Sequence, residues 1–249
     1  MTYSFFSQFE ITRLLTIHPF GNFDISITNA TVFMVIPVIL FTFIYTTNNQ
    51  NGLIVPTRYQ SVLEISYNEV NNMVKENIPH GGSRFFPFIL TLFFFLALIN
   101  LIGLIPYTFT PTSHGAVAFG LSFSIFIGSS FIAIQKFGVD YFSMFMPAGA
   151  PMAMAPFLIL IEFISHLAKA ISLGLRLAAN ITAGHLLFAI LSSFIWTMMT
   201  SISFLSFVGL FPLAIALFIT ILEIAVALIQ AYVFCLLTTI YLNDSVHLH

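Results

Sequence analysis

The chain of 249 residues has only 7 Lys and Arg and 9 Asp and Glu, so that 6% of it is charged and 59% is hydrophobic. Soluble domains are about one quarter charged, and a chain of this length cannot enclose so much apolar surface. The net charge of −2 offers no basic surface for nucleic acid, and the single cysteine, Cys235, excludes a disulfide framework or a thiolate metal cluster. The composition predicts an all-α integral membrane protein.

Three segments have the length of ordinary membrane-spanning helices. Residues 25–47, 85–105 and 115–135 each supply about 20 largely apolar residues, which is what a helix needs to cross a bilayer. Pro106 and Pro111 lie between the last two segments and predict a tight turn between antiparallel helices.

Residues 57–76 have a different pattern, with five charged residues and with Val62, Val70 and Val74 at offsets that share one helical face. We expect an amphipathic helix on the membrane surface, and an ordinary solvated helix is the alternative.

The C-terminal part of the chain contains two much longer apolar segments, residues 148–196 and 207–243, separated by a polar stretch. About 40 residues of helix measure about 60 Å, twice the hydrocarbon core of a bilayer, so we expect both helices to be steeply tilted and paired as a hairpin. Pro156 and Pro212 suit the first turns of these helices. Residues 1–249 are therefore predicted to form a single membrane domain with about five crossing helices and one surface helix.

The basic residues predict the orientation. Five crossings place the termini on opposite sides, and the connections around residues 48–84 and 136–143 carry four basic residues, whereas those on the other side carry only Arg13. By the positive-inside rule the N-terminus faces outward and the C-terminus inward.

Arg176 is the least expected charge, because it lies deep within a predicted span. An arginine cannot lose its proton, so it must meet an anion or a water-filled cavity. A structural ion pair within this chain is the other interpretation.

Other polar residues share its helix and the last one. Glu162, His166, Lys169, Arg176 and Asn180 follow one helical stripe, while His185 faces elsewhere. Glu223 and Gln230 share a face of the last helix, and Asp244 lies about 31 Å further along it. Glu162 and Asp244 therefore belong to the inner side and His185 to the outer side, which suggests two polar paths that meet near one fixed cation.

Counted in residues from a turn near residue 200, Glu223 lies at nearly the same distance along its helix as Arg176 does along the preceding one. Pairing Glu223 with His185 therefore requires tilt, a kink or a bridging water.

Four polar residues have simpler interpretations. His166 and Lys169 are expected to stabilise their helix or to extend inward toward water. Asn100 is expected to make an interhelical hydrogen bond, and His114 to be solvated in the outer turn. Gly174 and Gly184 are small enough for close packing on another helix, either of this chain or of a separate subunit.

Several motifs together resemble subunit a of the rotary ATP synthases over nearly the whole chain. The resemblance is carried by residues 172–177 with Asn180, and by residues 100–107, 183–187 and 223–234. The pairing of His185 with Glu223, the N-terminal Gln8-Phe9-Glu10-Ile11 and the C-terminal residues 241–249 are similar to the mitochondrial branch, in particular to its fungal members.

The resemblance implies a role for each matching position. Arg176 would face the essential carboxylate of the rotating c-subunit ring and keep two half-channels apart. His185 and Glu223 would line the half-channel from the intermembrane space, and Glu162 and Asp244 the one to the matrix. The polar companions near the arginine would be Asn180 and Gln230.

The resemblance further implies a multi-pass protein of the mitochondrial inner membrane, with the N-terminus toward the intermembrane space and the C-terminus toward the matrix. Its partners would be the c-ring, other membrane and peripheral-stalk subunits, protons and lipid. We expect no cofactor, no metal, no nucleic acid and no catalysis by the chain itself, since it lacks a glycine-rich nucleotide loop. A stand-alone proton-coupled secondary transporter is the alternative.

Overall fold

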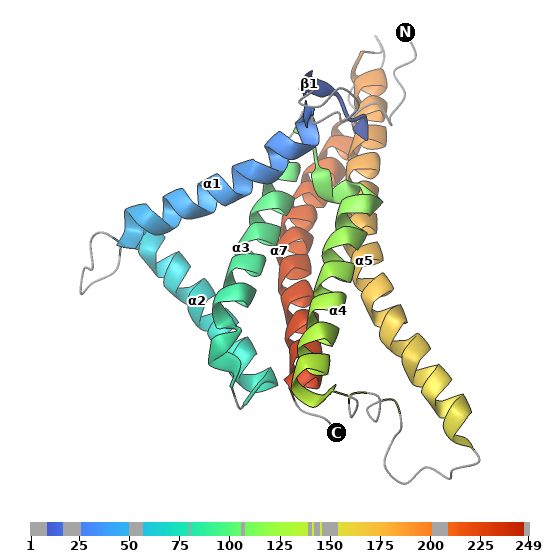
Figure 1. The fold of residues 1–249 in the computed structure, drawn as a ribbon. Coiled ribbons are helices and arrows are strands. Elements are labelled where there is room, and N and C mark those ends of the chain that lie inside the picture. The colour runs from blue at the N-terminus through green and yellow to red at the C-terminus, as the bar shows by residue number, and fades with distance from the viewer. Residues whose placement is uncertain are drawn as a thin grey trace. The chain divides into compact units, whose positions relative to one another are not determined.

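The computed structural model describes residues 9–16, 26–49, 57–79, 81–105, 108–138, 141, 145, 154–200 and 209–246 (Figure 1). Within these residues, five helices are long and apolar enough to cross a membrane. The predicted all-α membrane fold is therefore confirmed. The expected helix starts at residues 148 and 207, and Pro106 in the outer turn, lie outside the described residues.

The chain divides into two compact units, and both are built from non-contiguous segments. We call residues 1–50, 94–114 and 177–231 the first unit, and residues 51–93, 115–176 and 232–249 the second unit. Helices α3 (Phe86–Gly103), α5 (Ala155–Met199) and α7 (Leu210–Val246) each contribute one part to each unit. The single membrane domain expected over residues 1–249 stays a prediction.

The first unit begins with a short hairpin of β1 (Arg13–Leu15) and β2 (Ile27–Thr28), followed directly by α1 (Asn29–Asn49). Asn29 holds this start together, because its backbone N–H donates to the Thr12 carbonyl at 3.1 Å and its Nδ2 donates to the Glu10 carbonyl at 3.2 Å. The backbone N–H of Thr12 in turn donates to Asn29 Oδ1 at 3.3 Å. One side chain thus ties the N-terminal segment to the first residue of α1.

The short 3-10 helix η3 (Pro111–Ser113) belongs to the same unit and leads to residue 114. Pro111 occupies the first position of this helix, where its missing N–H costs no hydrogen bond. A Cβ added at Gly103 would collide with the Thr110 side chain, so the chain can fold back closely here only with glycine at the end of α3.

The second unit contains α2 (Arg58–Asn77), capped at its start by the Thr57 hydroxyl, which accepts from the Gln60 N–H at 3.4 Å. Val70, Met73 and Val74 are fully buried, which confirms an amphipathic helix. The predicted apolar face is buried only in its C-terminal half, because Val62 on the same face is 66% exposed. The 3-10 helix η2 (Gly82–Arg84) then leads into α3.

Also in the second unit, α4 (Gly115–Phe137) packs closely on the N-terminal half of α5. A Cβ at Gly174 would lie 2.7 Å from Ser122 Oγ and 3.2 Å from the Phe119 Cα, so the predicted close packing at Gly174 involves a helix of this chain. At the other end of α4, Lys136 Nζ donates to the Val246 carbonyl at 2.8 Å and thereby satisfies one free carbonyl at the end of α7.

The two C-terminal helices are long, with 45 residues in α5 and 37 in α7. At 1.5 Å per residue they measure about 67 and 55 Å, well beyond the thickness of a hydrocarbon core of about 30 Å. Pro156 and Pro212 both fall in first turns, where proline removes no intrahelical hydrogen bond.

Candidate functional site

A large cavity in the first unit contains two of the predicted site residues. We call it the outer cavity, because it holds the residues assigned to the outer side; its volume is about 760 Å³, and both His185 and Glu223 line it. Further polar lining comes from Glu10, Thr12, Asn29, Thr108, Ser192 and Thr220. The cavity therefore has room for many water molecules and carries three titratable groups.

The Glu223 carboxylate reaches across to α5 inside this unit. A Cβ placed on Gly184 would lie 2.7 Å from Glu223 Oε1, so the carboxylate occupies the space that the glycine leaves open. Among the described residues, Glu223 Oε1 and His185 Nε2 are buried and have no hydrogen-bond partner. Buried polar atoms normally have one, so these two atoms lack the pairing that is usual for buried groups.

The N-terminal segment contributes to the position of His185. The Phe9 ring meets the imidazole edge-on, with 6.1 Å between ring centroids and perpendicular planes. The next residue, Glu10, lines the outer cavity and is held at its carbonyl by Asn29. Asn29 therefore holds the segment in which Glu10 lines the cavity and Phe9 contacts His185.

Asn180 and Gln230, both predicted as polar companions, form a direct pair in the first unit. Asn180 Nδ2 donates to Gln230 Oε1 at 3.2 Å, and the Gln230 side chain is 4% exposed. This hydrogen bond joins α5 to α7 at a level deeper along α5 than His185. The second amide end, Gln230 Nε2, is buried without a partner among the described residues.

Asn100 makes the expected interhelical hydrogen bond, since its Nδ2 donates to the Ala227 carbonyl of α7 at 3.5 Å. The Thr112 hydroxyl donates to Asn100 Oδ1 at 3.4 Å, so both ends of this buried amide are used. His114, in contrast, is not simply solvated: its ring stacks on Phe109 at 5.3 Å and its Nε2 is buried. The prediction for His114 was wrong because η3 folds the turn back onto aromatic residues.

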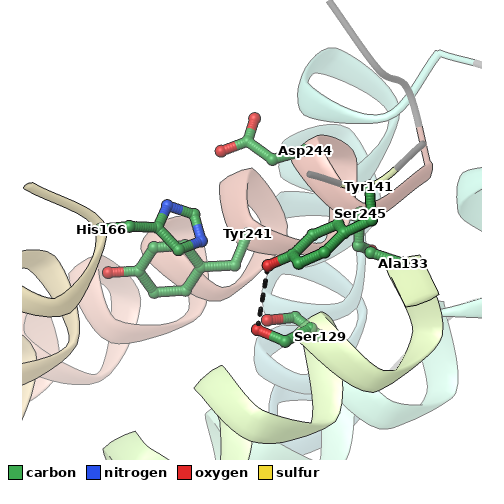
Figure 2. Close-up of a pocket in the computed structure, with 8 residues that line it drawn as sticks. Ser129, Ala133, Tyr141, His166, Tyr241, Asp244 and Ser245 are labelled. Atoms are coloured by element: carbon green, nitrogen blue, oxygen red, sulfur yellow. Dashed lines mark hydrogen bonds between the residues drawn. The ribbon is translucent and has the colours of Figure 1, made fainter. Parts of the chain in front are cut away.

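A second, much smaller cavity lies in the second unit, and we call it the inner cavity. Its volume is about 10 Å³, and Figure 2 shows its lining residues converging from α4, α5, α7 and the connection after α4. The lining consists of Ser129, Ser130, Ala133, Tyr141, His166, Tyr241, Asp244 and Ser245. It includes the predicted Asp244 and a histidine that the sequence did not single out for function.

His166 is buried, with 7% exposure, among three aromatic rings. Its centroid lies 5.4 Å from Phe126, 6.0 Å from Tyr241 and 6.3 Å from Phe145. The charges of Asp244 and Glu162 both act on this imidazole. The interpretation of His166 as a residue that extends toward water is therefore wrong, whereas Lys169 is exposed as that interpretation requires.

Glu162 itself is half-buried one helical turn before His166 and does not line the inner cavity. The structure thus brings Asp244 together with His166, while Glu162 influences the cluster through its charge.

Arg176 lines neither cavity and is exposed. No described residue forms an ion pair with it, so the interpretation as an ion pair within this chain finds no partner in the described part of the molecule. Its charge acts on Tyr241, as does the charge of Asp244. In Figure 2 the Tyr241 hydroxyl points away from Asp244.

The described residues contain no group of three or more His, Cys, Asp or Glu side chains that could hold a metal ion. Both cavities are lined by carboxylate, imidazole and hydroxyl groups, which can take part in proton transfer.

Known proteins resemble this chain over nearly its whole length. Residues 29–243 match the family described as "ATP synthase A chain". "ATP synthase subunit a" of Neurospora crassa is 45% identical over 98% of this chain and 94% of its own length. The protein of the same name from Metridium senile is 45% identical over 99% of both chains. "ATP synthase subunit a-2" of Arabidopsis thaliana is 47% identical over 97% of this chain and 71% of its own length.

Proposed function

This chain belongs to the ATP synthase subunit a family, and from that premise we propose that it is the proton-translocating stator subunit of the membrane sector. It is a multi-pass membrane component of a mitochondrial ATP synthase. In the proposed arrangement it supplies two offset half-channels and the fixed cation Arg176, which faces the carboxylates of a rotating c-subunit ring. ATP chemistry belongs to partner subunits.

The outer half-channel is the outer cavity. Its volume of about 760 Å³ supports access for water, and His185 and Glu223 are the proton-binding groups inside it. Because Glu223 Oε1 is close to Gly184, a proton on this carboxylate has already reached α5, the helix that carries Arg176. From there the Asn180–Gln230 pair continues the polar path along the same helix.

Arg176 is the observation that carries the proposal. It is an exposed, permanent cation without an ion-pair partner among the described residues, in a helix of 45 residues that is otherwise strongly apolar. Placing such a charge within a bilayer costs a few kcal/mol or more unless an anion outside the chain meets it. A ring carboxylate on a neighbouring subunit is such an anion.

Three of the exposed residues near Arg176 on α5 are small. Ser172, Ala179 and Ala183 lie four residues before, three after and seven after Arg176, and all three are exposed. Small residues let another helix approach closely in a membrane, which supports a moving helical partner on this face.

The cycle then follows from electrostatics. A carboxylate of the c-subunit ring is ionised when it faces Arg176. It then takes up a proton delivered from the outer cavity, and the neutral carboxyl group can rotate through lipid. It later loses this proton into the inner path, where Glu162 and Asp244 accept it. One proton that crosses a potential of about 150 mV releases about 3.5 kcal/mol, and the fixed charge of Arg176 opposes direct leakage of a proton between the two paths.

The orientation follows the same proposal. The N-terminus faces the intermembrane space and the C-terminus the matrix, so that the outer cavity opens toward the side from which protons arrive.

The deciding experiment measures proton flux and ATP synthesis in membrane vesicles that carry the assembled complex with Arg176→Ala. We expect the complex to assemble, synthesis to disappear and passive proton leakage to increase. The control is Arg84→Ala, which removes an exposed arginine outside the spans and should leave coupling intact. Coupled synthesis near the wild-type rate in Arg176→Ala would overturn the proposed function.

A further inference from the structure

The inner cavity has the dimensions and the polar lining of a binding site for one water molecule. A single water needs about 10–15 Å³ and two to four polar partners, and the cavity measures about 10 Å³. The Ser129 hydroxyl donates to the Phe126 carbonyl at 2.9 Å and the Ser245 hydroxyl to the Leu242 carbonyl at 2.7 Å. Since these hydroxyls donate to their own helices, their oxygen lone pairs remain available to accept hydrogen bonds.

The opposite side of this cavity carries the groups that exchange protons. Asp244 comes from α7 and His166 from α5, and both line the cavity, as the labelled side chains in Figure 2 show. On a further side, the Tyr141 hydroxyl donates to Ser130 Oγ at 3.5 Å. A water molecule bound in this cavity would be bordered by an imidazole, a carboxylate and several hydroxyls.

The imidazole of His166 is held in place by its surroundings. Three aromatic rings, of Phe126, Phe145 and Tyr241, contact it from α4, the connection after α4 and α7. With 7% of its surface exposed in this chain, the imidazole exchanges protons with groups packed around it rather than with open water.

The charged and titratable groups around His166 come from each packed element. Lys169 and Glu162 flank it on α5, Asp244 and Tyr241 face it from α7, and Tyr141 lines the same cavity. Charges of both signs therefore lie near this imidazole.

We propose that His166 carries protons on the inner path and exchanges them with Asp244 through one water molecule bound in the inner cavity. This inference rests on the proposed function. A proton arriving from the side of the c-subunit ring binds the unprotonated nitrogen of the neutral His166 imidazole and forms imidazolium. The imidazolium passes a proton to the water, the water passes one of its own to the Asp244 carboxylate, and Asp244 releases it to the inner aqueous phase. Only bonds to hydrogen change, no electrons are transferred, and all three groups return to their starting states.

The test compares three variants in the assembled complex in vesicles, with proton flux measured per assembled complex over a range of inner pH. His166→Phe keeps an aromatic ring in the aromatic surroundings but cannot bind a proton, and we expect about tenfold lower flux and an altered dependence on inner pH. His166→Gln keeps a hydrogen-bonding side chain and should show the same loss. His114→Phe, which replaces a histidine that stacks on Phe109 outside both cavities, should behave as wild type.

Wild-type flux and an unchanged pH profile in His166→Phe and His166→Gln would overturn the relay, even if fewer complexes assemble. If only His166→Phe fails to assemble, His166→Gln decides the question. Failure of the proposed function gives a different result, because the wild-type complex then conducts no coupled protons or Arg176→Ala retains synthesis.

Discussion

The two cavities differ by nearly two orders of magnitude in volume, although both contain a histidine and a carboxylate from the same two helices. The outer cavity measures about 760 Å³ and the inner cavity about 10 Å³. In the outer cavity, His185 and Glu223 belong to a wide space that water can fill. In the inner cavity, His166 and Asp244 line a space large enough for one water molecule.

This difference changes what limits proton movement at each place. Water can rearrange in a wide cavity. The rate of proton transfer there therefore depends more on the presence of titratable groups than on the distance between them. In a cavity that holds one water molecule, each lining atom determines whether a hydrogen-bonded chain exists. We therefore expect the outer site to be sensitive to changes of charge and the inner site to be sensitive to changes of volume.

Among substitutions in the two cavities, the largest expected effect comes from removing the outer carboxylate. Glu223→Gln keeps the size of the side chain but removes its capacity to carry a proton, and we expect ATP synthesis to fall on the order of 100-fold. Thr220→Val is the matched control: Thr220 lines the same cavity, and its hydroxyl donates to its own helix at Ala216. Synthesis within about twofold of wild type in Glu223→Gln would remove the outer cavity from the proton path.

Replacing one alanine in the wall of each cavity by valine tests the difference in volume directly. Ala133→Val adds two methyl groups to the inner cavity, which should exclude the water, destabilise the packing by about 1–3 kcal/mol and lower proton flux several-fold. Ala189→Val adds the same groups to the wall of the outer cavity and should leave flux near wild type. Flux measured in vesicles, together with thermal stability of the complex, checks both. Equal effects of the two substitutions would contradict the comparison.

Gly184→Ala tests whether the outer site tolerates a displaced carboxylate. The new Cβ would lie 2.7 Å from Glu223 Oε1, so the flexible end of Glu223 must move while the backbone stays in place. We expect normal assembly and a loss of synthesis of about two- to fivefold, smaller than removal of the charge. Gly120→Ala in α4 is the control, since a Cβ there meets no atom within 4 Å.

The smallest expected effect concerns the N-terminal segment. Asn29→Ala removes the side-chain hydrogen bonds to Thr12 and Glu10, and residues 9–15 should exchange their amide hydrogens faster. Asn29→Asp keeps the acceptor for the Thr12 N–H and should retain part of the protection. Synthesis should fall by about twofold or less, because the wide outer cavity keeps its water and its titratable groups. Unchanged exchange in Asn29→Ala would show that the hairpin alone holds the segment.

The fold was largely predictable because apolar length is a direct property of the sequence. The spans, the amphipathic helix and the interhelical bond of Asn100 all followed from periodicity and from the cost of polar groups in lipid. Helix ends were less predictable: α5 ends at Met199 and α7 begins at Leu210, whereas the count took residue 200 as the end of both helices. Measured from these ends, Gly184 and Glu223 lie at similar levels, which removes the difficulty in pairing Glu223 with His185.

The inner site was harder to predict, because it depends on side chains brought together from three helices. The sequence placed Asp244 on the inner side but gave no reason to connect it with Ser129 of α4. His166 was expected to stabilise its helix or to extend inward toward water, whereas the structure surrounds it with aromatic rings. Helix α4 carries no charged residue next to Ser129, so the spacing of its residues did not mark a polar face there.

The division of three helices between the two units has a consequence for synthesis of the chain on the ribosome. The first unit is complete only when residue 231 has been inserted, and the second requires residues 232–249 as well. Each unit therefore depends on contacts between segments far apart in the sequence, which form slowly. A nascent chain that stops before its last helix leaves α4 and the first half of α5 without their buried neighbours from α7, so quality control in the membrane can recognise incomplete chains by that exposed polar surface.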